Sequence, residues 1–304
     1  MGYEQLELNL KDNNLVVQDN MFVHASYEMT SLEQKLLMIL ISTIKKGDIK
    51  TYRTTFRIRD IADLMNISVE PLYRDLPKAC RSLMKKIIEI KQPNGDWEMF
   101  NIVTYAKHKK KEGSVMMKIN EELEPYLVQL EDLFTSFKLA NILDLTSKYS
   151  IRIYQLSKSS SFKHEVAYTL EEFKKILKLN QKSYDRFNNI TSRILIPSID
   201  EINLKTDLNV DYEVLKLGTK AVGIKFYIEK KNESIIRLQN DSKKSKQNTF
   251  NNFEGRPESK DEKHMKLVEE KLLGWDKSDS KEEIAIDIEA DNSFVSNLLK
   301  ETQK

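Results

Sequence analysis

The chain has few of the residues with which enzymes build phosphate loops, metal centres or disulfides. Only eight of its 304 residues are glycine, and none lies in a G-x-x-x-x-G-K-[ST] sequence. That absence argues against the phosphate-cradling loop of a P-loop NTPase. The four histidines are isolated, and no Cys/His cluster has the spacing of zinc ligands. We therefore expect no catalytic site, no cofactor and no metal.

Cysteine and long apolar runs are also scarce. Cys80 is the only cysteine, so no internal disulfide can form, and we predict a small buried helical residue rather than a reactive thiol. No apolar run approaches the roughly 20 residues that a membrane span needs. The N-terminus lacks the basic-then-apolar order of a secretory signal. These features predict a cytoplasmic protein.

The two ends of the chain differ in charge. The total is only +2, but 13 of the 49 Lys/Arg and 16 of the 47 Asp/Glu lie from Glu233 onward, which leaves +5 on the preceding part. A basic body suits a polyanionic partner, although +5 is a weak signal for its size.

The most informative feature is an internal repeat. Residues 58–67 predict a short amphipathic helix, and a second helix is predicted from Pro71 to about Glu89. After a shift of 112 positions the pattern returns, in residues 170–179 and then from Tyr184 to about Glu201. A short helix, a break and a longer helix form a helix-turn-helix, which places its second helix in a DNA groove.

This offset aligns several side chains without a gap. It pairs Arg74 with Arg186, Arg81 with Arg193, Leu83 with Leu195, Ile87 with Ile199, and Glu89-Ile90 with Glu201-Ile202. An offset of 111 pairs Leu76 with Phe187 instead, and both registers stay open. Upstream, Thr30-Ser31 and Thr146-Ser147 each predict a helix N-cap, at an offset of 116.

Alternating segments follow the helices in each half. In the first half, residues 87–90 and 97–103 flank a turn with Asn94-Gly95, a strong hairpin signal, and a basic turn at 107–113 precedes a strand at 115–119. Asn120 then predicts the N-cap of a helix reaching Leu130. In the second half, residues 208–215 and 224–229 predict a β-hairpin. Helices followed by a basic-tipped hairpin predict a winged helix in each half.

The resulting fold class is α+β, with two tandem winged-helix domains. We divide the chain into an N-terminal arm at 1–20, in which Leu15-Val16-Val17 is a candidate edge strand, a first domain at 21–130 and a second at 131–232. A linker and acidic tail at 233–304 follow, with a short helix predicted near 258–273.

The candidate DNA contacts lie on the longer helix of each repeat and on the hairpin tips. Arginine can pair with guanine O6/N7 and asparagine with adenine N6/N7, whereas lysines on a wing contact phosphate. On the second domain the candidates are Ser183, Tyr184, Arg186, Asn188, Asn189, Ser192, Arg193, Lys216, Thr219 and Lys220. On the first they are Tyr73, Arg74, Lys78, Arg81, Lys85, Lys107, Lys109, Lys110 and Lys111. Solvated faces and turns are the alternative, while Phe187, Ile190, Ile194 and Leu195 are predicted to be core residues.

Over roughly residues 15–232, the chain resembles the iteron-type plasmid replication initiators in several stretches and in the order of those stretches. These stretches are Phe22-Val-His-Ala, Thr30-Ser-Leu-Glu-Gln-Lys-Leu-Leu, Tyr73-Arg-Asp-Leu-Pro-Lys-Ala-Cys, Tyr149-Ser-Ile-Arg-Ile-Tyr-Gln-Leu and Phe187-Asn-Asn-Ile-Thr-Ser-Arg-Ile-Leu. The tail matches only loosely.

The resemblance implies two winged helices related by a pseudo-twofold and binding to direct repeats at a plasmid origin. It assigns dimerisation and DNA backbone contact to the first domain and sequence-specific reading to the second. It also implies that host replication proteins, such as a helicase or its loader, are recruited, and that a homodimer on an operator inverted repeat represses the protein's own gene.

Two other functions compete with this interpretation. A winged-helix transcriptional repressor without a replication role would bind DNA through the same surface, so the sequence distinguishes it poorly from an initiator. A nicking enzyme would need a tyrosine beside paired histidines, and the chain has no His-x-His sequence.

Overall fold

The structure is a computed structural model, and it describes residues 14–44, 53–91, 95–127 and 134–231. The chain divides into two units, Met1–Lys244 and Ser245–Lys304, and every described residue lies in the first. The helix predicted near 258–273 and the rest of the predicted tail lie outside the described residues.

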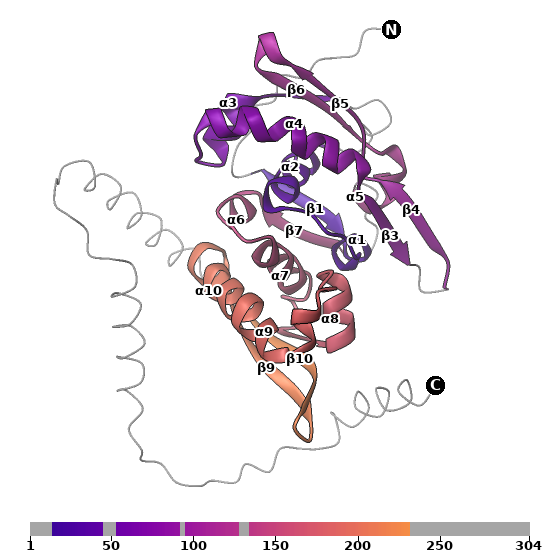
Figure 1. Ribbon diagram of the computed structural model, residues 1–304, viewed down its shortest axis with the longest axis vertical. Coiled ribbons are helices and arrows are strands. Elements are labelled where there is room, and N and C mark those ends of the chain that lie inside the picture. Colours follow the sequence, from indigo (N-terminus) through magenta and orange to yellow (C-terminus); the bar gives the residue numbers. More distant parts are fainter. Residues whose placement is uncertain (1–13, 45–52, 92–94, 128–133, 232–304) are drawn as a thin grey trace, which may run out of the picture. The chain divides into compact units, whose positions relative to one another are not determined.

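The first half contains a helix-turn-helix followed by a β-hairpin (Figure 1). Strand β2 (Thr54–Arg57) leads into α3 (Ile58–Leu64), and α4 (Val69–Lys85) follows the turn. Strands β5 (Val103–Lys109) and β6 (Ser114–Ile119) form the hairpin, and the sheet order is β2-β6-β5. This arrangement is a winged helix with the β5–β6 tip as its wing.

The second half repeats this order. Strand β8 (Glu165–Thr169) leads into α8 (Leu170–Ile176), and the hairpin of β9 (Leu208–Leu217) and β10 (Lys220–Lys230) gives the sheet order β8-β10-β9. The residues that cap α3 and α8, Arg57 and Thr169, are 112 positions apart. The duplicated winged helix predicted from the sequence is therefore present.

The longer helix of the second half differs from the continuous helix expected from Tyr184 to about Glu201. It consists of a 3-10 turn (Lys182–Asp185), α9 (Phe187–Ile190), a π-helical segment (Thr191–Leu195) and α10 (Ile196–Lys205). The π segment inserts one extra residue into the helical repeat. Leu195, its last residue, lies at offset 112 from Leu83, whereas Phe187, ahead of it, lies at offset 111 from Leu76, so both registers stay open.

The predicted end of the first recognition helix is wrong. Helix α4 ends at Lys85, and β3 (Ile87–Lys91) pairs antiparallel with β4 (Trp97–Asn101). Glu89 therefore lies on a strand, whereas its partner at offset 112, Glu201, lies in α10. β-Branched isoleucines favour a strand over a further helical turn, and Ile88 and Ile90 point alternately into the core while Ile87 is exposed. Gly95 in the turn has φ +95°, as expected for a hairpin.

The two halves meet at a two-stranded sheet. Strand β1 (Leu15–Asp19) pairs antiparallel with β7 (Phe134–Lys138), and the short helices α1 (Asn20–His24) and α6 (Ala140–Leu143) follow them. Antiparallel pairing of equivalent strands is the arrangement that a local twofold axis produces. The described part of the predicted N-terminal arm is thus a paired strand, with Val16 and Gln18 buried.

One helix in each half starts at a predicted cap. Thr30 and Glu33 form a capping box at α2 (Ser31–Ile41). At α7 (Lys148–Ser159) the cap is Ser147, so the offset is 117 rather than 116. The carboxylate of Glu201 also accepts from the Thr146 backbone N–H at 2.7 Å, which ties α10 to the start of α7. The helix predicted from Asn120 begins as a 3-10 turn (Glu121–Leu123) and continues as α5 (Glu124–Leu127); its predicted end at Leu130 lies outside the described residues.

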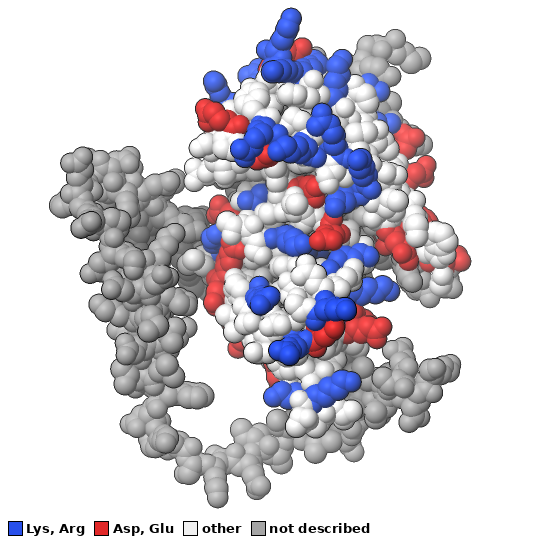
Figure 2. Space-filling view, in the orientation of Figure 1, with Lys and Arg blue, Asp and Glu red and all other residues white. Residues whose placement is uncertain are grey.

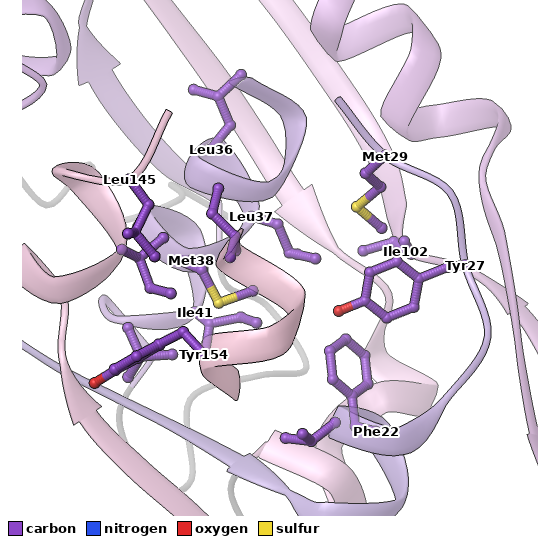
Figure 3. Close-up of a cluster of buried hydrophobic side chains, with 14 of the residues drawn as sticks. Phe22, Tyr27, Met29, Leu36, Leu37, Met38, Ile41, Ile102, Leu145 and Tyr154 are labelled. Atoms are coloured by element: carbon purple, nitrogen blue, oxygen red, sulfur yellow. The ribbon is translucent and has the colours of Figure 1, made fainter. Parts of the chain in front are cut away.

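Helices α2 and α7 pack together in the core (Figure 3). Side chains from α1, α2, α7 and the segments beside them fill the cluster: Phe22, Tyr27, Met29, Leu36, Leu37, Met38, Ile41, Ile102, Leu145 and Tyr154. The predicted core residues Ile190, Ile194 and Leu195 are buried, Phe187 packs against the core half-buried, and Cys80 is buried as expected.

A buried arginine links α7 to the end of α1 and the residues that follow it. Arg152 is 4% exposed, and its Nη2 donates to the carbonyls of Val23 and Ala25 at 2.9 Å each. Its guanidinium also lies 4.0 Å from the ring centroid of Tyr27. Carbonyl dipoles and an aromatic face thus compensate this charge, since no carboxylate pairs with it in the described ranges.

Candidate nucleic-acid interface

Helix α4 separates apolar and basic residues onto opposite faces. Leu72, Leu76, Cys80 and Leu83 are buried. The predicted contacts occupy the exposed face: Tyr73, Arg74, Lys78, Arg81 and Lys85. In Figure 2, lysine and arginine side chains gather over α4 and over the tip of the β5–β6 hairpin. The structure therefore brings the first-domain candidates to one surface.

Asp75 sits among the basic residues of this helix. Its two carboxylate oxygens accept from Nε and Nη2 of Arg74, at 3.0 and 2.9 Å, and Oδ1 also accepts from Lys78 Nζ at 3.2 Å. The hydrogen bonds from Arg74 and then Lys78 lower the pKa of Asp75 to about 2. Two of the five candidate contacts on α4 thus share one carboxylate, which the sequence analysis did not anticipate.

Tyr73 connects the helix to the wing. Gly113 closes the wing turn with φ +60°, and a Cβ added there would lie 2.3 Å from the Tyr73 hydroxyl oxygen. Glycine is needed on both counts, for the left-handed backbone and for the close approach of the tyrosine. The start of α4 and the wing therefore touch through this pair.

The wing of the first domain presents several lysines. Lys107 is exposed on β5, and Lys110 and Lys111 are exposed on a 3-10 turn (Lys110–Glu112). Lys109 is half-buried and pairs with Glu112 at 2.8 Å. Lys107, Lys110 and Lys111 are therefore open to solvent on this wing, and their contact with phosphate stays a prediction.

Two basic residues beside this wing are not among the contacts predicted from the sequence. Arg57 and Arg59 are exposed at the start of α3. The intervening Ile58 donates its backbone N–H to the Gly113 carbonyl at 2.8 Å, so this helix start adjoins the wing turn. The available signal was an Arg-Ile-Arg sequence at a predicted helix start.

Tyr184 does not lie where the sequence analysis placed it. It belongs to the 3-10 turn, is 8% exposed and packs against Tyr149. Burial, together with the hydrogen bond to Tyr184, raises the pKa of Tyr149. Because its side chain is buried, the role of Tyr184 in the fold is that of a core residue.

The helix proper begins after Arg186, which has an extended backbone (φ −86°, ψ 112°). Arg186, Asn188 and Arg193 are exposed. Two other candidates form local bonds: the Asn189 amide donates to the Ser183 carbonyl at 2.6 Å, and the exposed Ser192 hydroxyl donates to the Asn188 carbonyl at 2.9 Å. Among the predicted contacts of this segment, the exposed side chains without a local hydrogen bond are Arg186, Asn188 and Arg193.

The second wing is tighter than the loop expected at 216–223. Strands β9 and β10 extend to Leu217 and Lys220, which leaves Gly218 (φ +61°) and Thr219 at the turn. Lys216, Thr219 and Lys220 are all exposed. The predicted contacts of this wing therefore stand together at its tip.

The described ranges hold no group of three or more His, Cys, Asp or Glu side chains placed to bind a metal. Within the same ranges, each helix is too short or too polar to cross a membrane.

Two protein-family models match the two halves. Residues 15–158 match the model described as Initiator Replication protein, WH1, and residues 169–228 match the one described as Initiator Rep protein, WH2. The chain belongs to this family of replication initiators. The resemblance inferred from the sequence is thereby confirmed, as is the pair of tandem winged helices. The WH1 match runs through α7, past the predicted boundary at 130/131, and the domain division itself stays a prediction.

The initiator has similar proteins of known name. It is 27% identical over 236 residues to a replication initiation protein of Escherichia coli, which covers 74% of this chain and 73% of that protein. It also resembles the Pi initiator protein, whose crystal structure is in complex with iteron DNA, with a TM-score of 0.61. That likeness covers 73% of this chain and 100% of the other at 22% identity, and it shows a common fold.

Proposed function

We propose that this initiator binds double-stranded DNA at the direct repeats of a plasmid origin and starts replication there. The observation that carries the proposal is the duplicated helix-turn-helix, with exposed arginines on both longer helices and lysines on both wings. Two covalently linked winged helices bind one duplex at a high effective concentration, so a single chain can bind one repeat firmly. The iteron DNA bound to the Pi initiator supports the same class of target.

The two domains have different tasks in this proposal. The second reads bases through Arg186, Asn188 and Arg193, because these side chains are exposed at the N-terminal part of its recognition helix. The first contacts the DNA backbone through α4 and its wing, and it also forms the homodimer. In this division the wings position the protein, and the second recognition helix selects the sequence.

Three further roles belong to the same proposal. As a dimer the protein binds an operator inverted repeat and represses its own gene. On the origin it recruits host replication proteins, such as a helicase or its loader, and the segment 233–304 contributes to that step. It acts in the cytoplasm without enzymatic activity or cofactor.

The test of sequence reading is a binding titration on a cognate repeat and on random duplex. Arg193→Ala is expected to weaken binding to the repeat by about 1–3 kcal/mol and to relax preference at one base pair. Arg193→Lys keeps the charge but loses the paired hydrogen bonds, so it is expected to lose preference with a smaller loss on random DNA. Equal loss on both duplexes for both variants would make Arg193 a phosphate contact only.

The test of the phosphate contacts is salt dependence. The logarithm of the binding constant is expected to fall with the logarithm of salt concentration at a slope near −0.9 per neutralised phosphate. Substituting Lys110 and Lys111 with alanine is expected to make that slope shallower without changing base preference. A flat salt response of the unaltered protein would contradict backbone contact altogether.

The alternative function is a winged-helix repressor without a replication role. Deletion of residues 233–304 tests the recruiting role, which a repressor would not have. Under the proposal the truncated protein still binds the repeat, but the plasmid is maintained poorly. Normal maintenance would remove the recruiting role of that segment.

A further inference from the structure

Arg74 pairs with its neighbour Asp75 on α4. Asp75 accepts the Nε–H at 3.0 Å and one Nη2–H at 2.9 Å, which is the two-point geometry of a charge-assisted pair. The side chains nevertheless remain open to solvent, with exposed fractions of 69% for Arg74 and 37% for Asp75. A long exposed arginine is ordinarily free to rotate, so this pairing restricts a side chain that would otherwise be mobile.

The pairing leaves half of the guanidinium available. Of its five N–H groups, the two on the Nε side point to Asp75, and the opposite edge keeps one N–H on Nη1 and one on Nη2. Those two run parallel and match the O6 and N7 acceptors of guanine in the major groove. Arg74 lies in the second turn of α4, where a recognition helix meets base edges.

Other contacts fix the carboxylate and the helix. Lys78 Nζ donates to Asp75 Oδ1 at 3.2 Å, which holds the carboxylate from the next turn. Tyr73 lies against Gly113 of the wing, so the residue before Arg74 contacts the β5–β6 hairpin.

We propose that Asp75 is a positioning residue that presents Arg74 to a guanine, so that the first domain reads a base pair as well as the backbone. This role rests on the proposed binding to duplex DNA. It adds base reading to the backbone contact proposed for the first domain. In the second domain, neither Arg186, the counterpart of Arg74 at offset 112, nor Arg193 has a carboxylate partner within the described ranges, so this support is confined to the first recognition helix there.

The test is a base-preference profile on the cognate repeat. Duplexes carrying each of the four base pairs at each position are titrated with the full-length protein and with Arg74→Ala, Arg74→Lys and Asp75→Asn. Glu70→Gln is the matched control, because Glu70 is an exposed carboxylate on the same helix without an ion pair in the described ranges. Circular dichroism of each variant establishes that it is folded.

The expected result is a loss confined to one position. Arg74→Ala and Arg74→Lys lose preference for one G·C pair by roughly ten- to a hundredfold. Asp75→Asn loses preference at that same pair, although its affinity for random duplex rises because a negative charge near phosphate is removed. Glu70→Gln gains affinity on every duplex equally and keeps the profile unchanged.

Two results would overturn the proposal. If Asp75→Asn raises affinity on every duplex with an unchanged profile, Asp75 merely competes with phosphate for Arg74 and Lys78. If Asp75→Asn alters the profile but Arg74→Ala does not, the carboxylate contacts a cytosine amino group itself. Both results leave the proposed function standing as long as Arg193→Ala weakens repeat binding; absence of any preference in the unaltered protein would end that function instead.

Discussion

Asn66 and Lys178, 112 residues apart, have the same left-handed backbone at the same point of their helix-turn-helix units, with φ +51° and +53°. The hydrogen bonds around them also repeat: Ile67 N donates to Ala62 O at 3.0 Å, and Leu179 N donates to Lys174 O at 2.9 Å. This six-to-one bond with a left-handed residue is a Schellman cap. The helix ends of the two repeats therefore match residue by residue.

The first prediction follows from that cap. A lysine in the left-handed region costs about 1 kcal/mol that glycine does not. Lys178→Gly is therefore expected to raise the free energy of unfolding by about 0.5–1 kcal/mol in urea titrations. The control is Lys175→Gly, an exposed position within α8, which is expected to lower it by about 1 kcal/mol. Equal destabilisation by both would contradict the assigned cap.

A second prediction concerns the contact between α4 and the wing. Gly113 and Gly218 both have positive φ, but only Gly113 has a side chain close to the Cβ direction, the Tyr73 hydroxyl. Both glycine-to-alanine variants are expected to lose about 1–2 kcal/mol of stability from backbone strain. Gly113→Ala is expected to lose more, because the tyrosine must move.

The Tyr73→Phe background isolates that difference. Removing the hydroxyl leaves the ring carbon Cζ at 3.5 Å, an ordinary contact distance. The additional cost of Gly113→Ala should then disappear, whereas the cost of Gly218→Ala should stay the same. If the difference in stability loss between Gly113→Ala and Gly218→Ala stays the same in this background, the Tyr73 hydroxyl does not contact the wing.

The sequence predicted the architecture well because the repeat and the turn residues are local signals. The Thr30 and Ser147 caps and both wing hairpins follow from alternation and capping chemistry. The π segment at Thr191–Leu195 was not predicted, because it depends on the packing of the whole helix and not on a local pattern.

The candidate site was predicted less completely than the fold. Tyr184 was misplaced because an aromatic residue at a helix start suits either a groove or a core, and burial against Tyr149 decides between them. The Arg74–Asp75 pair was missed because neighbouring residues on a helix ordinarily point apart, so spacing gives no hint of it. The role of each exposed candidate on DNA stays a prediction.

A third prediction is a pH dependence of stability. Burial, and next the charge of Arg152, lower the pKa of His24 to about 4 from 6.5, while Glu172 opposes the shift. The unfolded chain therefore binds a proton at higher pH than the folded chain. The contribution of His24 is present above pH 6.5 and is lost as the pH falls toward 4, by up to about 3 kcal/mol.

Urea unfolding between pH 7.5 and 4.5 measures this loss. His24→Gln is expected to flatten the curve in that range. Glu201 titrates elsewhere: burial opposes ionisation, but hydrogen bonds from Lys205 and Thr146 prevail and lower its pKa to about 2, so its contribution is lost only below about pH 4.5. A curve that stays equally steep in His24→Gln would assign the loss to other groups.

A fourth prediction concerns the reactivity of the lone thiol. Burial raises the pKa of Cys80 to about 11, against a smaller opposing effect of Arg81. The thiolate is the reactive form, so alkylation by iodoacetamide at pH 8 is expected to be at least about a hundredfold slower in the folded protein than in urea. Cys80→Ser abolishes labelling and serves as the blank. Similar rates in both conditions would contradict the burial of this side chain.

Hydroxyl-radical footprinting on the DNA flanking the gene tests the central claim most directly. If two linked winged helices read successive turns of one duplex, the protein protects tandem blocks in direct repeat, each with two patches about 10 base pairs apart. Arg193→Ala should lose protection at the patch of the second domain first. A single palindromic block, or one patch per repeat, would contradict the account.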